Sequence, residues 1–217
     1  EPYVLLPLAR HLSYTSREDL ITEFRNYQPA LEGLAQPGDS ENGLELVLPF
    51  PISTRDVFGW LGQNISSHTP SQLYDALLTA LAQSMLHFDT AFGFAYDRSV
   101  SGNVSWLDFT HGITFSNAVR VMCGRYPKLW PQGLLQMACF VGRNRRYLDL
   151  EQDESRWIVA DESKFLAETH ATILDHGLRD PILSARLLKT ATAVEEEITF
   201  ASDSCKKYLL AALNRFF

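Results

Sequence analysis

The sequence predicts an all-α protein, a single multi-helix domain of about seven helices over residues 1–217. Apolar residues recur at three- and four-residue spacing through most of the chain, which is typical of amphipathic helices. Helix-start signals precede several of these runs, such as the N-cap and first-turn pair Thr69 and Pro70. The exception is an irregular region near 36–70. Its segment 44–52 (LELVLPFPI) contains two prolines, so we expect an extended segment or a short edge strand rather than a central strand.

The expected helices follow one another with short connections. Ser16 is a candidate N-cap for the first helix, and a short helix over 53–65 is expected to end near Gly62. Gly124 is a candidate C-cap for the helix that starts near Trp106. Besides the short helix, the predicted spans are 16–35, 70–96, 106–123, 130–148, 160–177, 181–201 and 202–217.

The composition excludes several classes of function. Hydrophobic residues make up 46% of the chain and charged residues 21%, as in ordinary globular proteins, and the net charge is −7. A nucleic-acid partner would need a basic face, and the one basic cluster, 142–148 (GRNRRYL), is followed at once by acidic residues. No run approaches the ~18 apolar residues of a membrane-spanning helix, and no signal peptide is visible. We therefore expect a cytoplasmic protein with neither a nucleic-acid nor a membrane partner.

The three cysteines are Cys123, Cys139 and Cys205, and no CxxC spacing indicates a zinc ribbon or a redox dithiol. Cys123 and Cys139 lie among apolar helical residues, so we expect buried free thiols, which suit a reducing compartment. A hydrolase that uses Cys123 or Cys139 with a histidine is one functional alternative. It would require an accessible thiol with a lowered pKa.

The stretch 106–120 (WLDFTHGITFSNAVR) places His111 in the middle of an apolar run. Residues three and four apart share a helix face, so His111 lines up with Phe115, Ala118 and Met122. This face is apolar enough to be buried, and a buried imidazole needs partners for its ring nitrogens. Two interpretations follow. His111 is either a core histidine bonded to a backbone carbonyl and a side chain, or a residue that takes part in chemistry.

Arg186 and Lys189 are neighbours on the helix that follows Pro181, on a face whose other residues are apolar or small. In one interpretation this face is a solvated edge, where Lys189 pairs with the acidic residues 195–197. In the other, Lys189 is buried with a lowered pKa. Such a lysine can act as a base, or can be carbamylated into an anionic metal ligand.

Three further histidines are candidate metal ligands. His87 follows a helical run and can point inward, while His170 and His176 lie six residues apart on one helix. That offset places them on different faces, so they do not form an i, i+4 chelate. A cation at the helix C-terminus is an alternative role for His176, next to Gly177. Glycine-rich phosphate loops, GxSxG elbows and the paired ExxH motifs of di-iron bundles are absent from the sequence.

Four segments agree in order and spacing with a known family: 86–97 (LHFDTAFGFAYD), 106–127 (WLDFTHGITFSNAVRVMCGRYP), 134–144 (LLQMACFVGRN) and 169–197 (THATILDHGLRDPILSARLLKTATAVEEE). They resemble the questin oxidase-like family. That family is helical, and its characterised members are oxygenases that open the rings of polyketide-derived quinones in a Baeyer–Villiger type cleavage. The resemblance implies a histidine-bound metal, such as iron or another divalent transition metal.

By this resemblance His111, in FTHGIT, becomes a candidate metal ligand or catalytic histidine. Lys189, in RLLK, occupies a family position that usually reads HxxK, with Arg186 in place of the histidine. This departure removes one ligand and adds a positive charge that would repel a metal. Either His176, His170 or His87 compensates, or this member has lost the site. The family's histidine-bearing amino-terminal half has no counterpart here. We therefore expect the C-terminal part of a longer protein, partnered by an N-terminal chain or domain.

The leading hypothesis is an oxidoreductase that oxygenates and cleaves a ring of a quinone or polycyclic aromatic substrate, with His111 and Lys189 as catalytic residues and metal ligands. A pocket of Trp106, Phe109, Phe115 and Phe140 would suit such a flat molecule. The alternative is a non-catalytic helical binding or assembly domain that has lost the metal site.

Overall fold

A computed structural model describes residues 25–39, 46–94, 104–174, 177 and 181–217. Its described part contains eight α-helices and no β-ladder beyond one isolated bridge, which confirms the all-α prediction. The helices are α2 (Tyr27–Glu32), α3 (Thr54–Asn64), α4 (Pro70–Leu86), α5 (Trp106–Arg125), α6 (Trp130–Asn144), α7 (Glu162–Leu174), α8 (Pro181–Glu197) and α9 (Asp203–Phe216). Short 3₁₀ turns connect several of them, among them η3 (Thr90–Phe94), η5 (Pro127–Leu129) and η7 (Glu154–Trp157).

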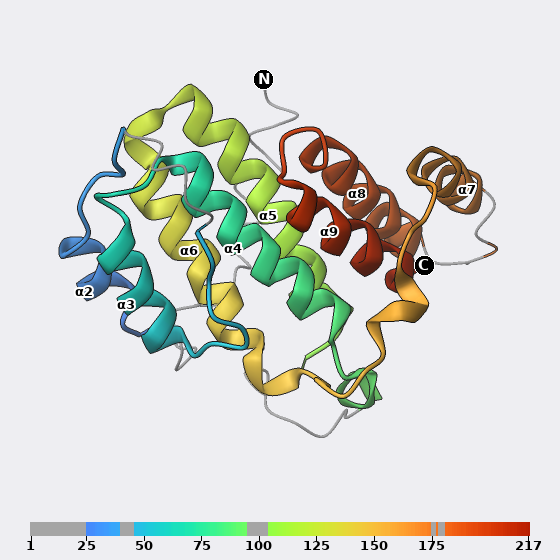
Figure 1. The fold of residues 1–217 in the computed structure, drawn as a ribbon. Helices are drawn as coiled ribbons and strands as arrows, with labels where there is room; N and C mark the ends of the chain where they lie inside the picture. The colour runs from blue at the N-terminus through green and yellow to red at the C-terminus, as the bar shows by residue number, and fades with distance from the viewer. Residues whose placement is uncertain (1–24, 40–45, 95–103, 175–176, 178–180) are drawn as a thin grey trace.

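Helix α4 forms the centre of the fold, with α9 on one side of it and α6 and α3 on the other (Figure 1). Its apolar residues are spread around the helix instead of forming one stripe, so it is buried on most of its circumference. The predicted start is confirmed: the Thr69 side chain accepts from the Gln72 N–H, and the Gln72 side chain accepts from the Thr69 N–H. This capping box fixes the first turn, where Pro70 costs no hydrogen bond.

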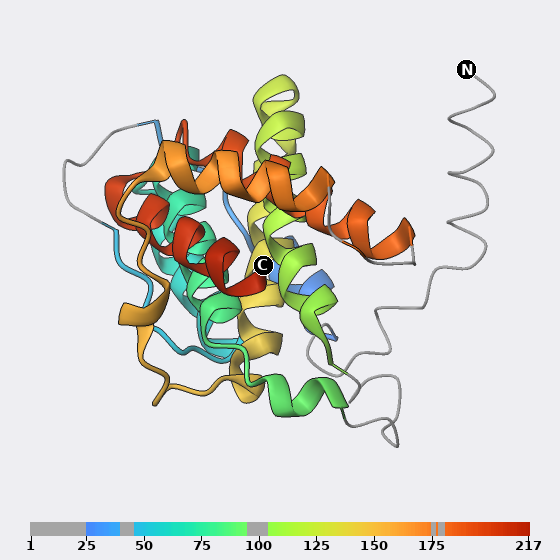
Figure 2. The same cartoon turned by 90° about the vertical axis from the view of Figure 1, so that its right-hand side faces the viewer.

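The other helices surround this centre. α5 and α6 pack on α4 and on each other, α3 covers α6, and α8 packs against both α5 and α9. Helix α7 runs alongside α8 on the outside of the bundle, as the view turned by 90° makes clear (Figure 2). The helices α5 and α8 are therefore in contact although they are far apart in the sequence.

Several predicted helix ends are wrong for reasons of tertiary structure. The helix expected over 70–96 stops at Leu86, because His87, Phe88 and Asp89 pair with the segment after α6 through bonds such as Asp149 N–H to the His87 carbonyl (2.8 Å). The helix over 106–123 continues through Gly124 to Arg125, so this glycine is not a C-cap. α6 and α8 end at Asn144 and Glu197, short of the predicted ends. α7 is described as far as Leu174, and residues 175–176 of the predicted span lie outside the described residues.

The irregular region contains the short helix α3, which ends at Asn64 rather than near Gly62. The described residues 46–52 are irregular, with bends at Phe50 and Pro51, and belong to no ladder, so the edge-strand alternative is wrong for this part. The Trp60 indole N–H holds the segment by donating to the Val47 carbonyl at 3.2 Å. Of the helix expected over 16–35, the described part is helical at Tyr27–Glu32, and residues 16–24 lie outside the described residues.

None of the helices in the described ranges is both long and apolar enough to cross a membrane. Cys123 and Cys139 are buried thiols outside any disulfide, as the sequence predicts, and so is Cys205.

Candidate functional site

An apolar cavity of about 340 Å³ lies where the N-terminal end of α5 meets α8 and the C-terminal end of α9. We call it the Trp106 pocket, and its walls include Phe88, Trp106, Leu107, Thr110, Arg186 and Phe216. Its volume is at the small end of the range of ligand sites, roughly 300–1,000 Å³. Trp106 was expected in a substrate pocket from the sequence, whereas Phe88 and Phe216 were not, because they come from distant parts of the chain.

The aromatic wall is held in place by ring contacts. The Trp106 ring lies 5.1 Å from that of Phe88 and 5.3 Å from that of Phe216, centroid to centroid. Behind them, Phe88 packs on the fully buried Phe109 at 4.4 Å. The Arg215 guanidinium lies 5.5 Å from the Trp106 ring and donates to the carbonyls of Leu86 and Phe88. The pocket wall is thus a rigid aromatic surface.

The first turn of α5 is fixed by its own caps. The Ser105 side chain accepts from the Leu107 N–H, and the Asp108 carboxylate accepts from the Ser105 N–H at 3.0 Å. Arg143 of α6 pairs with the same carboxylate at 2.8 Å, largely shielded from solvent. This arrangement orients Trp106 and Leu107 toward the pocket.

His111 lies one turn beyond Leu107, on the surface between α5 and α8. Its side chain is exposed, so the core-histidine interpretation is wrong. The buried face of α5 carries Phe109, Ile113 and Ser116 instead, and His111 is turned away from that face. Partial burial, together with the nearby Lys189 and Arg186, lowers the pKa of His111 below 6.5, and Asp108 opposes this shift. His111 is therefore a neutral imidazole at neutral pH.

Arg186 forms part of the pocket wall and is half-buried, while Lys189 is exposed one turn further along α8. The solvated-edge interpretation of Lys189 is therefore confirmed and the buried-lysine interpretation is wrong. The expected pairing of Lys189 with residues 195–197 is not found. The reason is that the acidic residues have other partners: Glu195 contacts His170, while Glu196 and Glu197 contact Asn117 and Arg120. Lys189 and Arg186 instead face His111.

The other candidate histidines do not join this group. Both ring nitrogens of His87 are engaged, Nδ1 with the Asp149 carbonyl at 2.9 Å and Nε2 with Glu154 at 2.8 Å. His170 Nε2 lies 2.5 Å from Glu195 on the α7–α8 contact. His176 lies outside the described residues.

The described side chains do not fit a histidine-bound metal centre. Nowhere within the ranges that the structure describes do three His, Cys, Asp or Glu side chains gather as a ligand set. Lys189 and Arg186 lower the pKa of His111, and such nearby positive charge would oppose a divalent ion, although the Asp108 carboxylate acts in the other direction. The metal remains a prediction from the resemblance.

Three of the four aromatic residues predicted to form one pocket lie elsewhere. Phe115 and Phe140 line a different hollow, together with Met122 and Leu129, and Phe109 is in the core. The reason is helical geometry, because Phe115 lies more than two turns from Trp106 along α5. Only Trp106 of the four borders the pocket described here.

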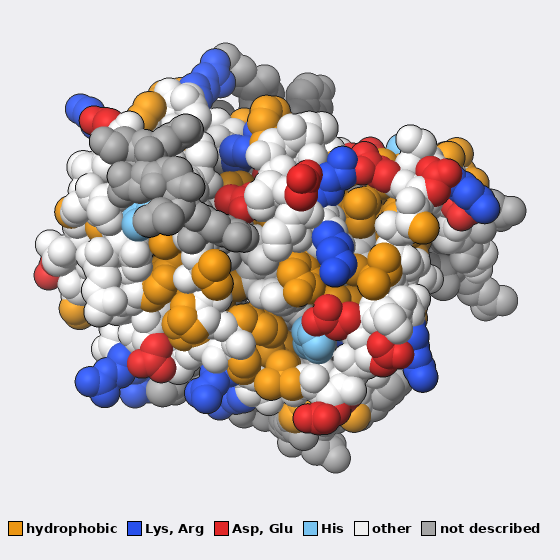
Figure 3. All heavy atoms as spheres, viewed as in Figure 1, with side chains coloured by type: hydrophobic (Ala, Val, Ile, Leu, Met, Phe, Trp, Pro, Cys, Tyr) orange, Lys and Arg blue, Asp and Glu red, His pale blue; other side chains and the backbone are white. Residues whose placement is uncertain are grey.

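A wider hollow of about 1,090 Å³ lies between the segment 46–50, α4 and the start of α9. The segment crosses in front of α4 in Figure 1, and Figure 3 shows hydrophobic side chains gathered across the same face, with charged groups scattered among them. Asp75 in this hollow accepts from the Ser202 N–H at 2.9 Å and from its hydroxyl at 2.6 Å. Its carboxylate therefore has a structural role.

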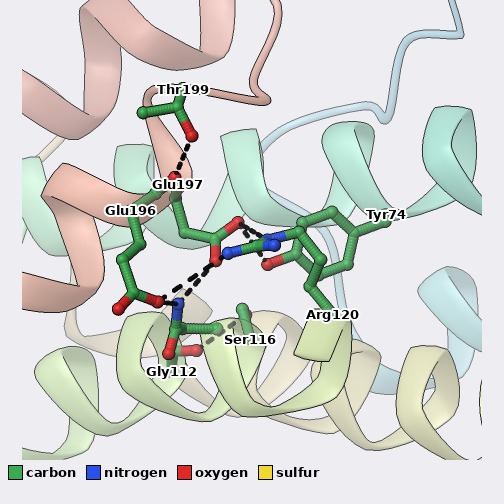
Figure 4. Close-up of polar contacts among 8 residues, drawn as sticks. Tyr74, Gly112, Ser116, Arg120, Glu196, Glu197 and Thr199 are labelled. Carbon is green, nitrogen blue, oxygen red and sulfur yellow. Dashed lines mark hydrogen bonds and ion pairs between the residues drawn. The ribbon is translucent and has the colours of Figure 1, made fainter. Parts of the chain in front are cut away.

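A buried polar cluster joins α4, α5 and α8 around Glu197, whose side chain is fully buried. Figure 4 shows Tyr74 and Arg120 both pointing toward this carboxylate. The Tyr74 hydroxyl donates to it at 2.8 Å, and the Arg120 Nε donates at 2.9 and 3.0 Å. Burial and the adjacent carboxylate raise the pKa of Tyr74. The cluster is fully paired and closed to ligands, so we assign it to stability.

The comparisons with known proteins identify no relative: no family model, curated protein or solved structure matches this chain. A function is therefore inferred from the residues of the Trp106 pocket and from the resemblance to the questin oxidase-like family.

Proposed function

We propose that the protein binds a flat aromatic molecule in the Trp106 pocket and oxidises it with dioxygen, as an oxidoreductase of the questin oxidase-like kind. The observation that carries the proposal is the aromatic wall of Phe88, Trp106 and Phe216, which borders a cavity next to a neutral histidine. An apolar cavity with a few polar groups at one side is the usual form of a small-molecule site. The two residues predicted to be catalytic are close in sequence to residues of the pocket wall: His111 follows Thr110 on α5, and Lys189 is one turn from Arg186 on α8.

A phenol or hydroxyquinone fits this arrangement chemically. The neutral imidazole of His111 can accept the phenolic proton, because its lowered pKa keeps it unprotonated at neutral pH. The cations Arg186 and Lys189 stabilise the phenolate that is left. In a Baeyer–Villiger type cleavage, one oxygen atom of dioxygen enters a ring carbon–carbon bond next to a carbonyl. The other oxygen atom leaves as water, with two electrons and protons from a reductant such as a reduced nicotinamide.

Oxygen consumption with hydroxylated anthraquinones tests the proposal, with reduced nicotinamide as the electron source. We expect oxygen uptake to be coupled to a product heavier than its substrate by one oxygen atom. Trp106→Leu should abolish most of the uptake, while Phe115→Leu is a matched control outside the pocket. His111→Asn should lower turnover more than it lowers substrate affinity.

The alternative function, a binding domain without catalysis, is favoured by one observation. The described histidines are dispersed, and His87 has no free ring nitrogen for a metal. If the anthraquinones bind with a dependence on Trp106 but no oxygen is consumed, the oxidoreductase proposal is wrong and the binding function replaces it.

A further inference from the structure

Two cations at the edge of the Trp106 pocket have no acidic partner in the part of the chain that the structure describes. No described carboxylate lies within 4.0 Å of Arg186 or Lys189, and no hydrogen bond of either side chain is found there. Other cations nearby are used: Arg143 pairs with Asp108, and Arg215 donates to two backbone carbonyls. Free cations beside an apolar cavity are unusual in a chain whose net charge is −7.

The two cations act on the same place. Arg186 and Lys189 are three residues apart on α8, so their side chains share a face of the helix. α8 packs against α5, and Arg186 and Leu187 of α8 are part of the pocket wall. Both cations also lower the pKa of His111 on α5. Their positive potential therefore acts on the side of the pocket that Arg186 forms.

Two hydroxyls in the pocket wall already have hydrogen-bond partners within the fold. The Ser105 hydroxyl accepts from the Leu107 N–H, and the Thr110 hydroxyl donates to the Leu107 carbonyl. Among the described residues that line the pocket, the charged one is Arg186, whose guanidinium is a planar fork of donors that matches the two oxygens of a carboxylate. An apolar aromatic cavity with a guanidinium at its edge selects a ligand that has both an aromatic ring and a carboxylate.

We propose that Arg186 and Lys189 form an anion subsite at the edge of the Trp106 pocket, which binds a carboxylate attached to the aromatic ligand. The inference rests on the proposed function for the location of the aromatic part and adds the class of ligand, an aromatic carboxylate.

Calorimetric titration of the full chain with anthraquinone-2-carboxylate and with the neutral anthraquinone-2-carboxamide tests the subsite. We expect the carboxylate to bind about tenfold more tightly than the amide, a preference that shrinks as salt is added. Arg186→Gln should remove most of the preference and Lys189→Gln part of it, while affinity for the amide changes less than about twofold. Lys128→Gln is the matched control, because Lys128 lies past the far end of α5, about 30 Å from Trp106 along a 20-residue helix.

A second readout separates direct contact from a general effect of charge. Bound carboxylate should raise the pKa of His111 in an NMR titration, since it neutralises the two cations that lower it, and the amide should leave it unchanged. Equal binding of the two ligands, or a preference that survives in Arg186→Gln, would overturn the subsite. These titrations need no reductant or turnover, so a charge preference without oxygen uptake would leave the subsite standing and reject only the oxidation. Failure of both ligands to bind would reject the subsite together with the pocket.

Discussion

The Arg120 Nε–H points between the two carboxylate oxygens of Glu197, at 2.9 and 3.0 Å, and this contact joins α5 to α8 in the interior. Glu197 is fully buried, whereas Arg120 is partly exposed and stacks on the Phe200 ring at 4.1 Å. Asn117 donates to Glu197 Oε1 at 2.9 Å, and Tyr74 donates to Oε2 from α4. A buried charge is tolerated here because both of its oxygens have donors.

Glu197→Ala should therefore lower the free energy of unfolding by about 3–5 kcal/mol, because it leaves Arg120, Asn117 and Tyr74 without their acceptor. Urea denaturation followed by circular dichroism measures the loss. Glu196→Ala is the matched control, since Glu196 is half-exposed and its loss should cost less than about 1 kcal/mol. Equal losses in the two variants would contradict the structural role given to Glu197.

Gly142→Ala should destabilise the contact between α6 and α3. A Cβ atom there would lie 2.3 Å from the Thr54 Cα and 2.4 Å from its backbone nitrogen, and backbone cannot move aside as a flexible side chain can. We expect a loss of about 2–3 kcal/mol in the free energy of unfolding. Gly124→Ala is the opposite case, because no heavy atom lies within 4 Å and the residue is inside α5. There, alanine should add about 0.5–1 kcal/mol through its higher helix propensity.

His111 should titrate below its ordinary pKa of 6.5 when its C–H proton is followed by NMR against pH. Its folded-state pKa is lowered, so between that value and 6.5 the unfolded chain binds a proton that the folded chain does not. Stability should consequently fall as the pH drops from 6.5 through the folded-state pKa, and this contribution should be absent in His111→Gln. Lys189→Gln should bring the pKa of His111 closer to 6.5, and Lys128→Gln should not change it.

The three thiols should be protected in the native protein. Cys123 is 3% exposed, Cys139 and Cys205 are fully buried, and burial raises the pKa of Cys123 and of Cys205. We expect a colorimetric thiol reagent to label all three only as fast as the protein unfolds, and to label them at once in denaturant. Rapid labelling of native Cys123 would revive the hydrolase alternative, which these features oppose.

The positions of most helices could be predicted from the sequence, since capping and amphipathic spacing are local. Thr69, Pro70 and Gln72 fix the start of α4 through bonds that span three residues. Its end could not be predicted. Residues 87–96 continue the apolar spacing, and α4 stops at Leu86 because His87 and Asp89 bond to residues 147 and 149 after α6. A contact across some 60 positions leaves no local signal.

The candidate site shows the same division. The sequence by itself determined the all-α class, the caps, the buried cysteines and the choice of His111, Arg186 and Lys189 as side chains that need an explanation. Only the tertiary structure decided that His111 faces solvent beside two cations, that Phe88 and Phe216 join Trp106, and that Phe115 and Phe140 lie elsewhere. Helical periodicity tells which residues share a face, but the packing of α4, α8 and α9 around α5 determines what that face meets.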